Sequence, residues 1–172
     1  MTNLPWEVSL LAKRHERASF DCGNAELNSF LQQFARQNQS ENVGRTWVAT
    51  SGADPRVLGF YTLTVASVSR DRFSAEEVRR VPRYPVPVAH LGRLAVDKSA
   101  QGKKLGEHLL LHALEQIHRV SQVVGIFAVE VRAKDDRAAR FYERFGFKRA
   151  QDDGLHLYLG AKVLTQLFGP AR

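Results

Sequence analysis

The chain of 172 residues is 44% hydrophobic and 25% charged, ordinary proportions for a single compact domain spanning residues 1–172. No apolar run reaches the roughly 18 residues that cross a bilayer. The N-terminus carries no secretion pattern and the single cysteine, Cys22, excludes an intramolecular disulfide, so we expect a cytoplasmic protein with no membrane segment. The 25 Lys and Arg exceed the 18 Asp and Glu, and the net charge of +7 favours polyanionic partners.

The N-terminal half predicts a strand, a helix, a hairpin and one short helix, in that order. The strands cover 6–12, 45–51 and 57–69, and the last two are joined by a turn at 53–56. The helix covers 25–37, and its apolar face consists of Leu27, Phe30, Leu31, Phe34 and Ala35. Ser74 and Glu77 have the spacing of a capping box, which predicts a short helix ending before Pro82.

The C-terminal half alternates between strands and helices. We expect strands at 88–97, 123–132 and 155–160, with helices at 106–120, at 136–145 and at the C-terminus. The helix between the first two of these strands predicts that they run parallel. The core positions of the long helix are Leu105, Leu109, Ala113, Leu114 and Ile117. For the helix at 136–145 we expect Ala138, Phe141 and Phe145 to face inward and Arg137, Arg140 and Arg144 to face outward. The fold class is therefore α/β with a mixed sheet.

The segment Q-G-K-K-L-G at 101–106 follows a buried strand and opens a helix. Backbone N–H groups at a helix N-terminus lack intrahelical acceptors, and the helix dipole adds partial positive charge there. The glycines permit close approach, and Lys103 and Lys104 add two positive charges. The segment therefore predicts an anion site suited to a phosphate or pyrophosphate.

Two segments resemble the sequence boxes of the GNAT superfamily of N-acetyltransferases. L-A-V-D at 94–97 followed by Q-G-K-K-L-G is similar to the acyl-CoA pyrophosphate loop, and D-D-R-A-A-R-F-Y-E-R-F-G-F at 135–147 is similar to the second box. Lys104 stands where the first box often has Gly, so its backbone must be compatible with a right-handed conformation or mildly strained. Asp135 replaces the usual Asn, which removes a hydrogen-bond donor.

The resemblance implies an acyl-CoA N-acyltransferase fold with splayed central strands and acetyl-CoA as co-substrate, with no metal. Tyr142 is the implied catalytic acid, because a phenol stays protonated at neutral pH and can donate to a leaving thiolate. The main chain of Leu94 and Val96 is expected to hold the pantetheine arm, with the Val96 N–H facing the thioester carbonyl. The residues expected to bind the co-substrate are Leu94, Ala95, Val96, Gln101, Gly102, Lys103, Lys104, Leu105, Gly106, Asp135 and Phe141.

Histidines are candidates both for the general base and for metal ligands. His90 and Glu130 lie on the two central strands, and each could serve as a base or as a structural group. An α-amine needs less help than a lysine side chain, because its pKa is near 7.7–8.0 against about 10.4. His108 and His112 have the i, i+4 spacing of zinc ligands, but no third ligand accompanies them, so we expect solvent-facing residues.

Further segments resemble one branch of this superfamily, the toxins of type II toxin–antitoxin modules that acetylate aminoacyl-tRNA. They are F-D-C-G at 20–23, L-N at 27–28, F-L at 30–31, R-T at 45–46 and Y-P-V-P at 84–87. The resemblance implies aminoacyl-tRNA as acceptor, a ribbon-helix-helix antitoxin as partner and a homodimer. Two alternatives stay open: an acetyltransferase of a small amine or protein N-terminus, and a non-catalytic module that binds CoA or an antitoxin. The candidate RNA-binding residues are Arg36, Arg45, Arg70, Arg72, Arg79, Arg80, Arg83, Arg137, Arg140 and Arg144.

Overall fold

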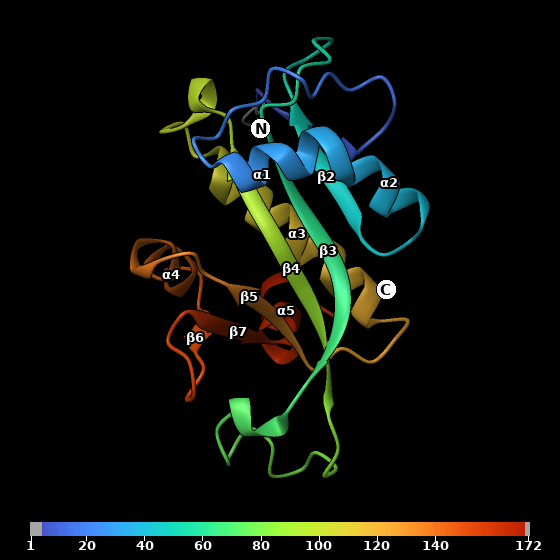
Figure 1. Cartoon of the computed structure of the whole chain (residues 1–172). Coiled ribbons are helices and arrows are strands. Elements are labelled where there is room, and N and C mark those ends of the chain that lie inside the picture. Colours follow the sequence, from blue (N-terminus) through green and yellow to red (C-terminus); the bar gives the residue numbers. More distant parts are fainter. Residues whose placement is uncertain (1–4, 171–172) are drawn as a thin grey trace. The chain divides into compact units, whose positions relative to one another are not determined.

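The computed structural model describes residues 5–170, so both ends of the predicted domain lie outside the described residues (Figure 1). Its seven strands follow the order β1-β2-β3-β4-β5-β7-β6 in one sheet, which confirms the mixed α/β class. The chain divides into two compact units. Unit 1 holds the described residues up to Thr64 together with Gly92–Ala113, and unit 2 holds Val65–Leu91 together with the described residues from Leu114. No helix in residues 5–170 is long and apolar enough to span a membrane.

In unit 1, three antiparallel strands carry a helical layer. Strands β1 (Glu7–Leu10), β2 (Arg45–Thr50) and the first half of β3 (Gly59–Val68) pair in sequence order. The helical layer consists of α1 (Ala25–Ser29), a π-helical turn at Phe30–Phe34 and α2 (Ala35–Ser40). The main core of this unit is an apolar cluster formed by Leu11, Phe20, Phe30, Leu31, Ala35, Val48, Val57, Phe60 and Ala95.

The π-helical turn corrects one predicted core position. Phe30, Leu31 and Ala35 are buried as expected, whereas the Phe34 side chain is 49% exposed. A π turn advances the chain by about one residue more per turn than an α-helix, so the inward positions shift along the sequence. The regular 3.6-residue period assumed for 25–37 therefore placed Phe34 wrongly on the inner face.

Strand β4 (Val86–Val96) and helix α3 (Leu105–Ser121) connect the two halves of the sequence. The predicted core positions of α3 are all buried. Strand β5 (Ala128–Arg132) pairs parallel to β4, as the connecting helix predicted. The strand starts at 128 and not at 123, because Val123 and Val124 lie in the turn after α3 and are exposed.

In unit 2, β7 (His156–Gly160) pairs antiparallel with both β5 and the short β6 (Lys148–Arg149), a strand that the sequence pattern missed. Helix α4 (Asp136–Glu143) follows β5, and α5 (Ala161–Phe168) follows β7. The core face of this sheet is covered by the segment between β3 and β4, which contributes Phe73 and Val78 to a cluster with Val86, Val88, Ala128 and Tyr158.

The helix predicted after Ser74 does not form, although its capping contacts do. The Ser74 hydroxyl donates to Glu77 Oε1 over 2.6 Å, and the chain then makes consecutive turns up to the bend before Pro82. Glu77 also accepts a hydrogen bond of 2.6 Å from the Tyr158 hydroxyl on β7. The segment does not continue as a helix, because Glu77 is held by this long-range bond and the nearby prolines cannot extend a helix.

Candidate active site and a basic pocket

The predicted anion loop lies between β4 and α3 in unit 1. Residues 101–104 form a turn and α3 begins at Leu105. Gly102 has φ +76°, and a Cβ added there would meet nothing within 4 Å. Lys104 has φ +67°, so the strained alternative predicted for this position is the one observed. Lys103 and Lys104 are both exposed, which leaves their charges available to an anion.

A hydrogen-bond network holds the end of β4 to this loop. The Gln101 side-chain amide donates to the Val96 carbonyl over 2.9 Å and to the Cys22 carbonyl over 3.2 Å. Asp97 accepts from the Asp21 N–H over 2.8 Å and from the Ser99 N–H over 2.9 Å. The F-D-C-G segment at 20–23 therefore supports the loop, and Gln101 acts through its contacts to the backbone.

The register of β4 with β5 runs from Val88–Ala128 to Leu91–Val131, while β4 itself continues to Val96. Leu94 and Val96 are half-buried and Ala95 is buried. Gly59 of β3 lies against this segment, since a Cβ there would come within 3.2 Å of the Ala95 carbonyl oxygen and 2.8 Å of Leu109 Cδ1. The sequence pattern does not reveal the close packing at Gly59, because a lone glycine in a strand gives only a weak indication of backbone approach.

Tyr142 lies in unit 2, on the inner face of α4. Its side chain is 8% exposed and packs edge-on against Phe141 and Phe147, at ring-centroid distances of 5.2 and 5.5 Å. Burial raises the pKa of Tyr142 to about 12, because the phenolate would lose its hydration. The phenol is therefore fully protonated at neutral pH.

The orientation of α4 differs by one position from the prediction. Its buried residues are Ala139 and Tyr142, while Ala138 and Phe141 are half-buried. Asp135 is the N-cap of the helix and accepts from the Ala138 N–H over 2.8 Å. The structure therefore gives Asp135 a capping contact and places Phe141 beside Tyr142, while their predicted contacts with the co-substrate stay predictions.

Four polar side chains meet on the covered face of unit 2. His90 Nδ1 and His156 Nε2 both lie within hydrogen-bond distance of Glu130 Oε1, at 3.1 and 3.0 Å. The Arg72 guanidinium contacts His156 Nδ1. Burial alone would raise the pKa of Glu130, but the hydrogen bonds and electrostatic interactions with His90 and His156 outweigh it and hold the pKa below its ordinary value.

His108 and His112 were expected to face solvent, and the structure shows that they do not. Both side chains are half-buried: His108 packs against Trp6, and His112 packs against Trp47 and Tyr61. The Tyr61 hydroxyl and His112 Nδ1 are 2.7 Å apart. Within residues 5–170 no group of three or more potential ligands has a metal-binding arrangement.

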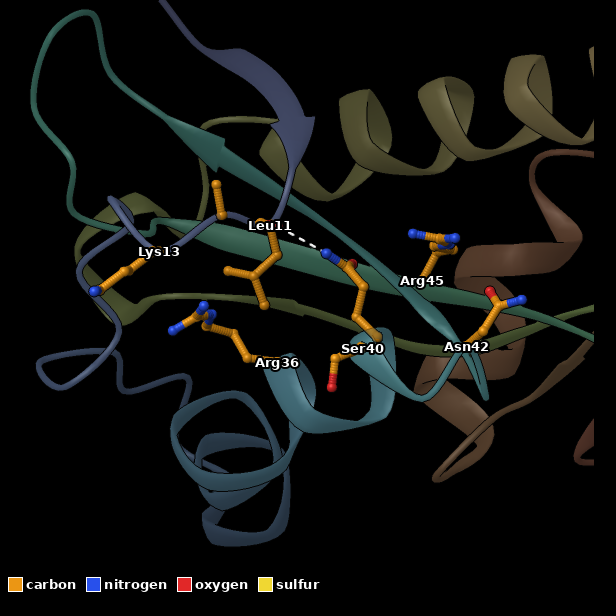
Figure 2. Close-up of a pocket in the computed structure, with 8 residues that line it drawn as sticks. Leu11, Lys13, Arg36, Ser40, Asn42 and Arg45 are labelled. Carbon is orange, nitrogen blue, oxygen red and sulfur yellow. Dashed lines mark hydrogen bonds between the residues drawn. The ribbon is translucent and has the colours of Figure 1, made fainter.

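A basic pocket opens on unit 1 beside α2 (Figure 2). Its volume is about 490 Å³, and Gln39 Nε2 closes one wall by donating to the Leu11 carbonyl over 2.8 Å. The lining holds three cationic side chains and no carboxylate: Leu11, Ala12, Lys13, Arg36, Gln39, Ser40, Asn42 and Arg45. Two of the predicted RNA-binding arginines, Arg36 and Arg45, therefore line one pocket.

The other candidate arginines have different environments. Arg70 donates to the Val78 carbonyl over 2.7 Å and Arg72 contacts His156, so both have structural partners in unit 2. Arg140 pairs with Asp136 over 2.8 Å, and Arg144 lies over the Phe141 ring. The remaining candidates, Arg79, Arg80, Arg83 and Arg137, are exposed.

The mixed sheet, the glycine-containing loop before a long helix and the buried tyrosine on the helix after the next strand match what the two boxes imply for an acyl-CoA-dependent N-acyltransferase. The family model described as an acetyltransferase (GNAT) domain matches residues 42–149. A tRNA-acetylating toxin of Mycobacterium tuberculosis is 37% identical over 151 residues, which cover 88% of this chain and 89% of that protein. The chain belongs to the GNAT acetyltransferase family.

Solved structures agree over nearly the whole chain. A variant of KacT matches with a TM-score of 0.91 and 31% identity, covering 96% of this chain and 100% of that one. AtaT complexed with acetyl-methionyl-tRNAfMet matches with a TM-score of 0.89 and 28% identity, covering 95% and 99%. A variant of AtaT bound to acetyl-CoA and to the C-terminus of the antitoxin AtaR matches with a TM-score of 0.82 and 26% identity, covering 96% and 99%.

Proposed function

We propose that this enzyme transfers the acetyl group of acetyl-CoA to the α-amine of aminoacyl-tRNA and thereby blocks translation as a toxin. An acetylated aminoacyl group cannot act as the nucleophile of peptide-bond formation. The observation that carries this proposal is the 37% identity to a tRNA-acetylating toxin over 88% of the chain. The similarity to AtaT, which was solved with acetyl-methionyl-tRNAfMet, supports the same acceptor.

In the proposed reaction, the loop at 101–106 binds the pyrophosphate of acetyl-CoA through backbone N–H groups at the start of α3. The open space around Gly102 and the exposed Lys103 and Lys104 fit that role. The main chain of Leu94 and Val96 is assigned to the pantetheine arm. A backbone N–H of this segment that faces the thioester oxygen would stabilise the tetrahedral oxyanion by roughly 3–4 kcal/mol.

Tyr142 is assigned to protonation of the leaving sulfur. Its pKa of about 12 lies above that of an ordinary thiol, near 8.5, so transfer to a solvated thiolate would be uphill. A thiolate formed in the same dry surroundings is itself more basic, because burial raises the pKa of any group that is charged when deprotonated. The two pKa values therefore approach each other at the moment when the carbon–sulfur bond breaks.

The basic pocket on unit 1 is proposed to bind phosphates of the tRNA. A single α-amine offers little binding energy, so most of the affinity must come from contacts to the nucleic-acid backbone. Lys13, Arg36 and Arg45 are exposed, and the lining contains no acidic side chain. Figure 2 shows these three side chains around the pocket opening, with Asn42 beside Arg45.

We also infer three properties of the protein in the cell. Its partner is an antitoxin of the ribbon-helix-helix type, and the AtaT structure with the C-terminus of AtaR supports an antitoxin partner. It acts as a homodimer in which each chain is one functional domain. It acts in the cytoplasm, where aminoacyl-tRNA is found.

The test incubates labelled acetyl-CoA and the enzyme with bulk aminoacyl-tRNA, and in parallel with the same tRNA after deacylation. We expect label on the charged tRNA alone. Label on neither RNA, together with efficient transfer to a polyamine or a peptide, would replace the proposed acceptor by a small amine or a protein N-terminus. Failure to label any acceptor, with CoA still bound, would favour a non-catalytic module.

A further inference from the structure

The face of unit 2 that carries Glu130 changes from apolar to polar along the strands. In β4, Val86, Val88 and His90 share one face because side chains alternate along a strand. The register pairs Val88 with Ala128 and His90 with Glu130, so the polar pair follows directly after the apolar pair. His90 is also one residue from Leu91, where the pairing of β4 with β5 ends.

The four polar side chains on this face differ in exposure. The side chain of His90 is 29% exposed, against 11% for Glu130 and 8% for His156. Glu130 Oε2 is buried without a hydrogen-bond partner in the described part of the chain. The cluster is therefore closed at the Glu130 and His156 end and open at His90.

Hydrogen-bond chemistry determines the tautomers. A guanidinium can only donate, so the contact of Arg72 with His156 requires a lone pair on His156 Nδ1. The proton of neutral His156 is then on Nε2, where it donates to Glu130 Oε1. Glu130 as a carboxylate can only accept, so His90 must donate to it from Nδ1. In neutral His90 this leaves the lone pair on Nε2, the nitrogen that does not face Glu130.

This arrangement is the one that a carboxylate-oriented histidine base requires. We propose that His90 is the general base of the acetyl transfer, and that Glu130, His156 and Arg72 are positioning residues that hold its imidazole with Nε2 unprotonated. The inference rests on the proposed function for the identity of the acceptor. It also agrees with the chain order, because β5 leads directly into α4, the helix that carries Tyr142.

The proposed step balances as follows. The neutral acceptor nitrogen attacks the thioester carbon, forming the carbon–nitrogen bond while the carbonyl electron pair moves to oxygen. His90 Nε2 takes one proton from the nitrogen as its acidity rises. The oxyanion electron pair then re-forms the carbonyl while the carbon–sulfur bond breaks, the bond's electron pair leaves with sulfur, and the Tyr142 hydroxyl protonates the thiolate. The imidazolium releases its proton to solvent, and the phenolate recovers one from solvent.

The decisive measurement is the slope of log kcat/KM against pH between about 5 and 6, with aminoacyl-tRNA as varied substrate. The amine, with a pKa near 7.7–8.0, is protonated in this range, and a general base adds a second proton that must be lost before the reaction. Wild type should therefore give a slope of 2, and His90→Gln a slope of 1 with about 10²-fold lower kcat/KM at pH 7. A folded fraction that is constant over this pH range lowers kcat/KM without changing the slope, so partial unfolding of that kind cannot produce this result.

Two further variants separate the base from a structural histidine. His108→Gln removes a half-buried imidazole outside the site and should retain the wild-type slope and rate. Glu130→Gln removes the carboxylate that holds His90 Nδ1, so the imidazole loses its orientation and kcat should drop about tenfold. Added imidazole should restore part of the activity of His90→Ala.

A slope of 2 in His90→Gln, or unchanged kcat/KM, overturns the assignment and points to another group, with His156 the first to test. If wild type acetylates a peptide α-amine and not aminoacyl-tRNA, the proposed acceptor is wrong. The same slopes measured with the peptide then decide whether His90 is the base.

Discussion

The end of β4 in unit 1 and the covered face of unit 2 present different kinds of chemical group. At the end of β4, the groups assigned to ligand binding are backbone N–H groups and exposed lysines. They are held in place by turns and by the Asp97 carboxylate, which accepts from the Asp21 and Ser99 N–H groups. In unit 2, the groups assigned to the chemistry are side chains: Tyr142, buried between two aromatic rings, and His90, held by the buried Glu130.

The difference decides what each region tolerates. A backbone-built site is insensitive to most side-chain replacements but sensitive to an added Cβ or an altered φ. A site of buried side chains responds to the loss of a single oxygen or proton, because the surrounding groups cannot turn to water for a replacement partner. The following substitutions test this contrast.

The largest effect is expected from Tyr142→Phe, which removes one oxygen from unit 2. Turnover should fall about 10²–10⁴-fold, because the sulfur would leave without its proton donor. CoA affinity and Tm should hardly change, since the ring still packs against Phe141 and Phe147. The measurement is kcat by acetyl transfer with CoA titration calorimetry, and Tyr84→Phe at an exposed position is the control. Turnover equal to wild type would make Tyr142 a core residue only.

The corresponding test of unit 1 is Gly59→Ala, which adds one carbon where backbone and core approach. The new Cβ would lie 2.8 Å from Leu109 Cδ1 and 3.2 Å from the Ala95 oxygen, so the segment before Val96 must shift. We expect a loss of about 1–3 kcal/mol in the free energy of unfolding by urea titration, accompanied by weaker CoA binding. Gly125→Ala is the control, because its Cβ would meet nothing within 4 Å. Equal stability of the two variants would contradict the close approach.

A smaller effect is expected from the double variant Arg36→Gln with Arg45→Gln in the basic pocket. If both arginines contact phosphates, the log–log salt dependence of tRNA affinity should lose a slope of about 0.7–0.9 for each. The acetyl-CoA KM should not change. Arg56→Gln removes an exposed arginine outside the pocket lining and serves as control. A slope that matches wild type would move the RNA contacts to the other exposed arginines.

The smallest effect is expected from Lys104→Gly. A left-handed backbone costs a residue with a Cβ about 1 kcal/mol, and glycine avoids this cost. Since φ is +67° at Lys104, the variant should be as stable as wild type or more stable by up to about 1 kcal/mol in urea titration. Marked destabilisation would mean that the Lys104 side chain, and not the backbone, maintains the loop.

The sequence predicted the elements that carry the candidate site residues better than the way these elements pack. Apolar spacing along 105–117 predicted α3, because the core positions of a helix repeat at a fixed local period. The two boxes identified the loop and the helix with Tyr142. The inner face of α4 was one position off, and Phe34 was placed on the wrong side, because a helix start and a π turn change the phase without changing the composition.

What the sequence by itself determined is local: the element types, the charge of +7, the glycine in a loop that opens a helix, and the family boxes. What only the tertiary structure decided depends on residues far apart in the chain. The contacts of Glu130 with His90 and His156 join three strands, and the pocket of Lys13, Arg36 and Arg45 joins three separate segments. Such groupings follow from strand register and packing, which no local pattern specifies, because residues become neighbours in a sheet through pairing and not through their spacing in sequence.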